Sequence, residues 1–189
     1  AIREKVIEHF ARIDLDLATA VAAGIGIPAP RSKDGQPANV RPSPALSMAN
    51  TVKDTIKSRR IAVLVAPGVS AQPLTAVKKA LEEAGGQVDI VAPSLGPVLS
   101  GDKAPLTANR SLLTVKSVLY DAVLVAGGVD GVRTLAASVD ARDFVTEAYK
   151  HGKTVGALGD GLELLKMARA GDGTGRSPGV VTGSPDGRG

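Results

Sequence analysis

Residues 60–66 read Arg-Ile-Ala-Val-Leu-Val-Ala, and this stretch decides the fold class. The run of apolar residues after Arg60 leaves no polar face, which is typical of a parallel strand covered on both sides. Amphipathic spacing then predicts a helix over residues 71–84, which Gly85-Gly86 ends. A second strand is expected over residues 88–92. A strand, a helix and another strand in this order predict a right-handed crossover unit.

The same alternation continues downstream. Residues 120–126 and 154–158 are predicted to be further buried strands. Helices are expected over residues 141–151, with Asp140 as the N-cap, and over residues 161–170. Strands that alternate with helices predict an α/β fold with a doubly wound, mostly parallel sheet of the flavodoxin-like type.

Two stretches of this α/β region are less regular. Residues 93–110 are rich in turn residues, and a small hairpin is expected near residues 98–100. Residues 171–189 contain seven glycines and two prolines, and only residues 180–182 are predicted to form a strand. We therefore expect the α/β domain, residues 60–189, to be truncated at its C-terminus.

A different composition precedes this domain. Residues 1–27 predict two short helices, the second with Asp14 as its N-cap, and their apolar stripe is expected to dock on something else. Residues 28–59 contain five prolines and few large apolar side chains, so they are interpreted as a linker. The end of this linker, residues 46–57, is expected to be a short helical stretch.

Composition restricts the possible functions. The chain has no cysteine, which excludes disulfides and thiol chemistry, and its two histidines, His9 and His151, are predicted to face solvent. The net charge of +4 is spread along the chain, and only four aromatic residues accompany it, so nucleic-acid binding is not expected. Apolar runs are too short to cross a bilayer, and no signal peptide is visible, so we expect a cytoplasmic protein without a membrane partner.

Candidate site residues lie where the predicted strands end. In an open α/β sheet, ligands gather beyond the carboxyl ends of the strands. These ends are Pro67–Ser70, Pro93–Gly96, Gly127–Gly131 and Gly159–Gly161. Gly127 and Gly128 could present backbone N–H groups to an anion, or they could simply form a tight turn with positive φ.

The turn Gly159-Asp160-Gly161 is the place where many α/β enzymes hold a strained nucleophile. Here it offers only glycine and one carboxylate. Asp160 could act as a nucleophile or base, but no histidine is positioned by the sequence to assist it, and a solvated turn residue needs no further explanation. The order of Gly156, Gly159 and Gly161 is G-x-x-G-x-G, which differs from a dinucleotide-binding loop.

The order of three segments resembles the class I glutamine amidotransferase-like superfamily of the PfpI type. The segments are Ile61–Gly68, Tyr120–Gly128 and Lys153–Leu165. Active members of that superfamily carry a cysteine at the elbow after the late strand, and the matching position here is Gly159. The resemblance therefore implies a degenerate elbow at Gly159 and Asp160, and a vestigial anion pocket at Gly127 and Gly128.

A closer resemblance covers nearly the whole chain. Val6–Ile27, Ser43–Ser47, Arg60–Val65 and Ser111–Gly128 are similar to the C-terminal region of large-subunit haem catalases. This resemblance implies that residues 1–27 are the end of the catalase helical domain. It also implies a homotetrameric parent that decomposes hydrogen peroxide to water and dioxygen on a haem bound upstream, with no cofactor or metal in this chain.

The resemblance predicts a non-catalytic domain with a role in stability, assembly or chaperone-like protection of unfolded clients. Two alternatives stay open. One is a free-standing PfpI-like hydrolase or glyoxalase-like enzyme that uses Asp160 in place of the usual cysteine. The other is a binding module for a small anion at Gly127, Gly128 and Gly159.

Overall fold

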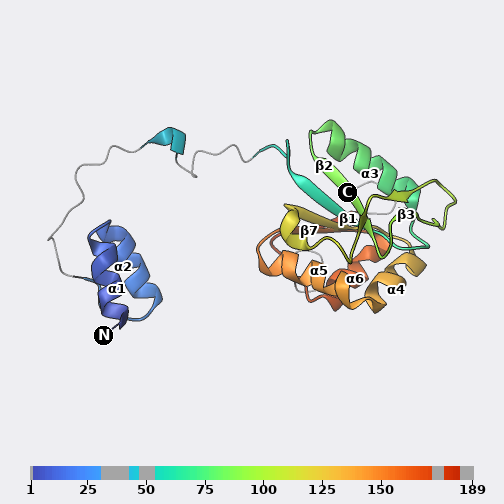
Figure 1. Ribbon diagram of the computed structural model, residues 1–189. Coiled ribbons are helices and arrows are strands. Elements are labelled where there is room, and N and C mark those ends of the chain that lie inside the picture. The colour runs from blue at the N-terminus through green and yellow to red at the C-terminus, as the bar shows by residue number, and fades with distance from the viewer. Residues whose placement is uncertain (1, 31–42, 47–53, 172–176, 184–189) are drawn as a thin grey trace. The chain divides into compact units, whose positions relative to one another are not determined.

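A computed structural model describes residues 2–30, 43–46, 54–171 and 177–183 (Figure 1). The chain forms two compact units, residues 1–53 and 54–189, and each is considered by itself. No helix within these described ranges is long and apolar enough to cross a membrane.

The described part of the first unit contains a pair of packed helices, α1 (Ile2–Ala11) and α2 (Leu15–Gly24), and a 3-10 turn at Pro44–Leu46. The predicted N-cap is confirmed, because the Asp14 carboxylate accepts a hydrogen bond from the N–H of Leu17 at 2.8 Å. The buried apolar side chains described here are Ile7, Ala18 and Ala22. Such a small core offsets little conformational entropy, so docking of the helix pair elsewhere stays a prediction.

The second unit confirms the predicted parallel sheet. Its described residues contain a six-stranded sheet in the order β5-β2-β1-β6-β7-β8, and every neighbouring pair in it is parallel. The strands are β1 (Arg60–Leu64), β2 (Gln87–Ala92), β5 (Arg110–Ser111), β6 (Ala122–Val125), β7 (Thr154–Leu158) and β8 (Val180–Gly183).

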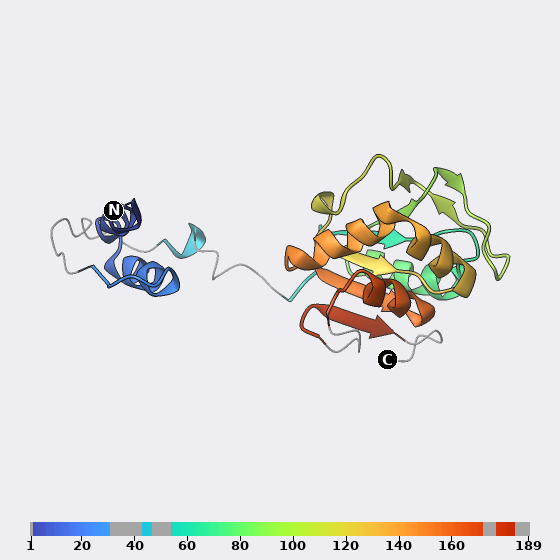
Figure 2. The same cartoon turned by 90° about the horizontal axis from the view of Figure 1, so that it is seen from below.

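Helices cover both faces of this sheet. Ile61 and Val63 of β1 belong to the core beneath α3 (Ala71–Glu83), whereas Ala62 and Leu64 belong to the opposite core. That opposite core is covered by α4 (Val129–Ala137), α5 (Val139–Lys150) and α6 (Leu162–Met167), with 3-10 turns at Ser117–Leu119 and Gly159–Gly161. Figure 1 shows α3 on one side of the sheet and the other three helices on the far side, and Figure 2 looks onto that three-helix layer.

Helix α4 was not predicted from the sequence, and the N-cap predicted for α5 was wrong. Gly131 interrupts the apolar pattern of α4, and it allows a close approach to the loop after β1, because a Cβ would lie 3.0 Å from the backbone nitrogen of Val69. Helix α5 begins earlier than expected, since its N-cap is Ser138 and not Asp140. The Ser138 hydroxyl accepts from the N–H of Ala141 at 3.3 Å.

Two expectations about loops are also corrected. The hairpin pairs β3 (Gly96–Pro97) with β4 (Thr107–Ala108), while Ser100 forms a parallel bridge with Val69. The described part of the expected 46–57 helix is not helical beyond Leu46, because the backbone around Ser58 is tied to the turn after α3. There the N–H of Ser58 donates to the carbonyl of Gly85 at 2.8 Å.

Leu74 offers a direct test of the core beneath α3, because it is fully buried there. We expect Leu74→Ala to lower the free energy of unfolding by about 3 kcal/mol through lost burial and a residual cavity. The matched control is Leu99→Ala, whose side chain is 79% exposed and which should change stability by less than about 0.5 kcal/mol. Urea denaturation followed by circular dichroism measures both, and equal losses would contradict the assigned core.

Candidate functional site

Three loops meet at the carboxyl edge of the sheet, where β1, β6 and β7 lie side by side. They are the loop that ends at Ser70, the pair Gly127-Gly128, and the turn Gly159–Gly161. All three were candidate segments in the sequence, and they line one small cavity. Residues 93–96, the fourth candidate segment, do not line this cavity.

The turn after β7 has the backbone of a nucleophile elbow with a glycine at the elbow position. Gly159 has φ +49°, the left-handed region in which a nucleophile elbow holds its residue under strain. Asp160 is exposed, and the cavity lining includes no histidine or tyrosine. Of the two histidines, His151 lies at the C-terminal end of α5 beside Glu147, and His9 is exposed on α1.

Close backbone packing explains Gly127 and Gly128. A Cβ at Gly127 would lie 2.8 Å from the carbonyl oxygen of Leu158, and one at Gly128 would lie 2.5 Å from that of Gly68. Gly128 also has φ +113°, which L side chains rarely adopt. The carbonyl of Gly127 is already used, because it accepts from the N–H of Ser70 at 2.9 Å.

The three glycines of the G-x-x-G-x-G pattern do not form one loop. Gly156 lies inside β7, whereas Gly159 and Gly161 lie in the turn that follows. Gly161 allows close approach to β6, since its Cβ would lie 2.7 Å from the carbonyl oxygen of Val125.

The cavity between the three loops has a volume of about 30 Å³. That is room for one or two water molecules, whereas small-molecule sites usually measure about 300–1,000 Å³. Its lining residues are Ser70, Pro73, Gly127, Gly128, Leu158, Gly159 and Asp160.

A carboxylate from the hairpin loop caps the helix beside this cavity. Asp102 accepts from the N–H of Gln72 in the first turn of α3 at 2.8 Å and from that of Ala104 at 3.3 Å. The hydrogen bond from Gln72 is the main reason that the pKa of Asp102 lies below its usual range. Ser70, the N-cap by position, makes no side-chain cap. The N-terminus of α3 therefore binds a carboxylate of its own chain.

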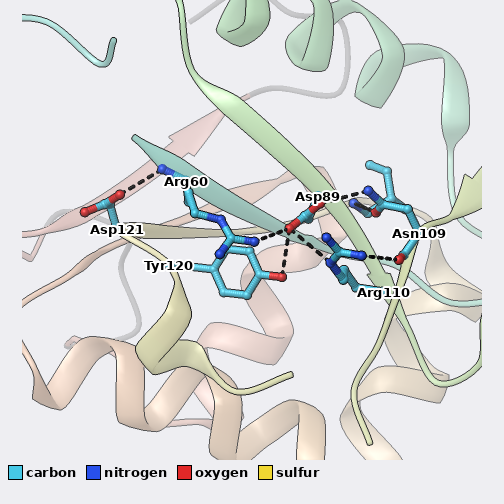
Figure 3. A network of polar contacts seen from close by, with 7 residues as sticks. Arg60, Asp89, Asn109, Arg110, Tyr120 and Asp121 are labelled. Atoms are coloured by element: carbon cyan, nitrogen blue, oxygen red, sulfur yellow. Dashed lines mark hydrogen bonds and ion pairs between the residues drawn. The ribbon is translucent and has the colours of Figure 1, made fainter. Parts of the chain in front are cut away.

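The densest polar cluster lies elsewhere, around Asp89 of β2 (Figure 3). Its carboxylate accepts from Arg60 at 2.9 Å, from Asn109 at 2.8 Å and from the Tyr120 hydroxyl at 3.1 Å. Arg110 lies 3.5 Å from the same carboxylate. Arg60 also stacks over the Tyr120 ring at 5.1 Å. The cluster thus joins β1, β2, the start of β5 and Tyr120, which lies just before β6.

Asp89 is charged because of these partners. Burial raises the pKa of Asp89. The hydrogen bonds from Arg60, Asn109 and Tyr120 together lower it by more, so the pKa lies below its usual value. Because the pKa of Asp89 is lower in the folded state than in the unfolded state, the ionised carboxylate stabilises the fold above about pH 4. This stability is lost as the pH falls through the pKa of the folded state. Among the described residues, no buried side-chain nitrogen or oxygen lacks a hydrogen-bond partner. Arg60 and Tyr120 lie at the amino end of their strands, at the edge of the sheet opposite to the one where ligands gather in open α/β sheets.

Sequence reasoning missed Asp89 and Asp102. An aspartate inside the strand QVDIVA was a usable signal, because aspartate is depleted in strands. Asp102 gave no local signal, since its partner Gln72 is 30 residues away. The described residues contain no group of three or more histidine or acidic side chains that could hold a metal ion.

Comparison with known proteins shows which family the second unit resembles. Residues 57–188 match the family described as the C-terminal domain found in long catalases. Catalase-2 of Bacillus subtilis strain 168 is 39% identical over 181 residues, which is 96% of this chain and 25% of that protein. Catalase HPII of Mycobacterium avium is 45% identical over 169 residues, which is 88% of this chain and 24% of that protein. The chain thus spans about a quarter of the length of these relatives.

The fold has relatives among solved structures. One is a two-domain protein from Anabaena variabilis with DJ-1/ThiJ/PfpI-like and ferritin-like domains. It has a TM-score of 0.56 at 20% identity and covers 60% of this chain and 33% of its own. This likeness confirms the PfpI-like fold that the sequence resemblance implied.

Gly128 provides a test of the packing between loops. We expect Gly128→Ala to cost about 3 kcal/mol or more, because the new Cβ meets backbone atoms that cannot move aside. Gly152→Ala is the matched control, since Gly152 has φ +67° with nothing within 4 Å, and it should cost only about 1 kcal/mol. If chemical denaturation gave the two variants the same loss, the loop contact would have no energetic role.

The Tyr120 hydroxyl predicts a pH dependence. Burial, followed by the charge on Asp89, raises the pKa of Tyr120 from 10.0 to about 12. Because the pKa of Tyr120 is higher in the folded state, the protonated hydroxyl contributes its full stability below the unfolded-state pKa of 10.0. That contribution is lost as the pH rises from 10 towards 12. Tyr120→Phe should therefore flatten the fall of Tm over this range, whereas Tyr149→Phe, the control on α5, should leave it steep. Identical slopes in all three proteins would refute the role of the hydroxyl.

Proposed function

The chain belongs to the family of C-terminal domains found in long catalases, and from this premise we propose that it is a non-catalytic domain that stabilises its parent enzyme. The observation that carries this proposal is the turn after β7. It keeps the backbone of a nucleophile elbow at Gly159, but it has no nucleophile and opens on a cavity of only about 30 Å³.

The elbow is in our view a remnant. Covalent catalysis needs a nucleophile, a base within hydrogen-bond reach and room for the substrate. Gly159 supplies none of these, and the exposed Asp160 has no histidine beside it in the cavity lining. A hydrolase or glyoxalase-like enzyme that uses Asp160 therefore receives less support, and so does an anion pocket at Gly127 and Gly128, where packing requires the glycines.

We assign the chemistry of the parent to the part outside this chain. On this proposal the parent decomposes hydrogen peroxide on a haem as a cytoplasmic homotetramer. We place the haem outside this chain, since His9 and His151 are exposed, the Tyr120 hydroxyl is bonded to Asp89, and Tyr149 packs partly buried against the α4–α6 core. The proposed partners of this chain are the rest of the catalase polypeptide and its neighbouring subunits.

Deletion of residues 54–189 from the full-length catalase tests the proposal. We expect the truncated enzyme to lose activity on heating about tenfold faster, which corresponds to about 1.4 kcal/mol of activation free energy. Initial peroxide turnover per haem should be unchanged, because no catalytic group is removed. The control is the full-length enzyme with Asp160→Ala. It should match the wild type in the rate of thermal inactivation and in peroxide turnover.

A second readout separates stabilisation from chaperone-like protection. Light scattering of a heat-unfolded client protein should fall in the presence of the full-length enzyme and less in the presence of the truncated one, if the domain protects clients. If the deletion changes neither thermal inactivation nor subunit assembly nor client aggregation, the proposed function is refuted.

A further inference from the structure

The outer edge of β2 is closed by a side chain as well as by a strand. Strand β5 is only two residues long, and it pairs with Val91 and Ala92. One residue before it, Asn109 continues the pairing with its side chain. The Oδ1 atom of Asn109 accepts from the N–H of Ile90 at 2.7 Å, and the backbone N–H of Asn109 donates to the carbonyl of Ile90 at 3.1 Å. A single residue therefore satisfies both backbone groups of Ile90 at this edge.

Asp89 determines which way the Asn109 amide is turned (Figure 3). The Nδ2 group of Asn109 donates to Oδ1 of Asp89 at 2.8 Å. An ionised carboxylate only accepts hydrogen bonds, so it faces the NH₂ half of the amide and leaves the oxygen half for the N–H of Ile90. The two bonds depend on each other, because an amide turned the other way would lose both. We call the Asn109 side chain with these two bonds the latch.

The latch lies at the base of the segment 93–109, which carries the β3–β4 hairpin. This segment leaves the sheet at the end of β2 and returns to it at the latch. At its far end Asp102 caps α3, and the N–H of Gly101 donates to the carbonyl of Val69 at 2.9 Å. The segment is thus fastened to the rest of the second unit at both ends, and an aspartate takes part at each.

We propose that the latch fastens the segment 93–109 and strand β5 to β2, and that protonation of Asp89 releases them. A protonated carboxyl group loses the charge that attracts Arg60 and Arg110, and one of its oxygens becomes a donor. The Asn109 amide is then no longer held in one orientation. Exposed N–H and C=O groups at a sheet edge are a template for pairing with another chain, so the closed latch protects this edge at neutral pH. The device is independent of the proposed function, because its residues all belong to the second unit.

The groups that face Asp89 leave it as the one that titrates below pH 7. Arg60 of β1 and Arg110 of β5 keep their charge, and Tyr120, whose pKa is raised to about 12, stays neutral. Among the described residues, the remaining partner Asn109 is uncharged. Burial raises the pKa of Asp89 and its hydrogen-bond partners lower it by more. The latch is therefore closed at pH 7 and opens below about pH 4.

Amide hydrogen exchange, measured by NMR in the 189-residue chain, tests the latch. At pH 7, Asn109→Ala should lower the protection of the Ile90 N–H at least about tenfold. The N–H of Leu112, on the far side of β5, should lose protection with it, because the edge strand comes loose. The N–H of Ala126 in the middle of the sheet should keep its wild-type protection. Gln87→Ala is the matched control, since it removes another exposed amide side chain from β2 and should change none of these protections.

Asn109→Asp is the decisive variant, because it reverses the direction of the pH response. At pH 7 the new carboxylate repels Asp89, so Leu112 should lose protection at least as far as in Asn109→Ala. As the pH falls towards about 5, the two carboxylates share one proton, and protection should rise again. In the wild type, protection should stay constant from pH 7 to about 4 and then fall. Protonation of Asp102 would act only in the wild-type direction, so it does not produce this reversal.

Three results would overturn the proposal. The first is wild-type protection of Leu112 in Asn109→Ala. The second is an equal loss of protection at Ala126, because the whole domain would then unfold and no local release would occur. The third is an Asn109→Asp protein that gains no protection on acidification, because Asp89 would then not control the latch.

Discussion

The structure depends on the burial of β1 on both faces. Ala62, Val63 and Leu64 are fully buried, and the strand pairs in parallel with β2 on one side and β6 on the other. The buried residues of a strand in this position must be apolar on both faces, and helices must cover both sides of the sheet. The division of the apolar residues between α3 and the α4–α6 layer follows from this requirement. So does the convergence of the loops after β1, β6 and β7 at one edge.

Polar groups in such a sheet are tolerated only where they are paired. Asp89 is 14% exposed in the middle of β2, and it stays charged because two arginines, an asparagine and a tyrosine surround it. This arrangement offsets the cost of burying a carboxylate. Asp102 has a related role at the edge of the cavity, where it caps the N-terminus of α3. In both places a charge that could have served a ligand instead holds the domain together.

The candidate site therefore combines the backbone of a nucleophile elbow with a glycine at the elbow position. Gly159 keeps a positive φ, and Gly127 and Gly128 keep the close loop contacts, but the space that remains fits water and not a substrate.

Local patterns were sufficient for part of this description. The apolar run after Arg60, the alternation of strands and helices, the cap at Asp14 and the empty elbow at Gly159 are all visible in the sequence, because each depends on neighbouring residues. Helix α4, the carboxylate of Asp102 on α3 and the partners of Asp89 were not visible. Each of these depends on residues that the sheet brings together from 20 or more positions away, so only the tertiary structure decides them.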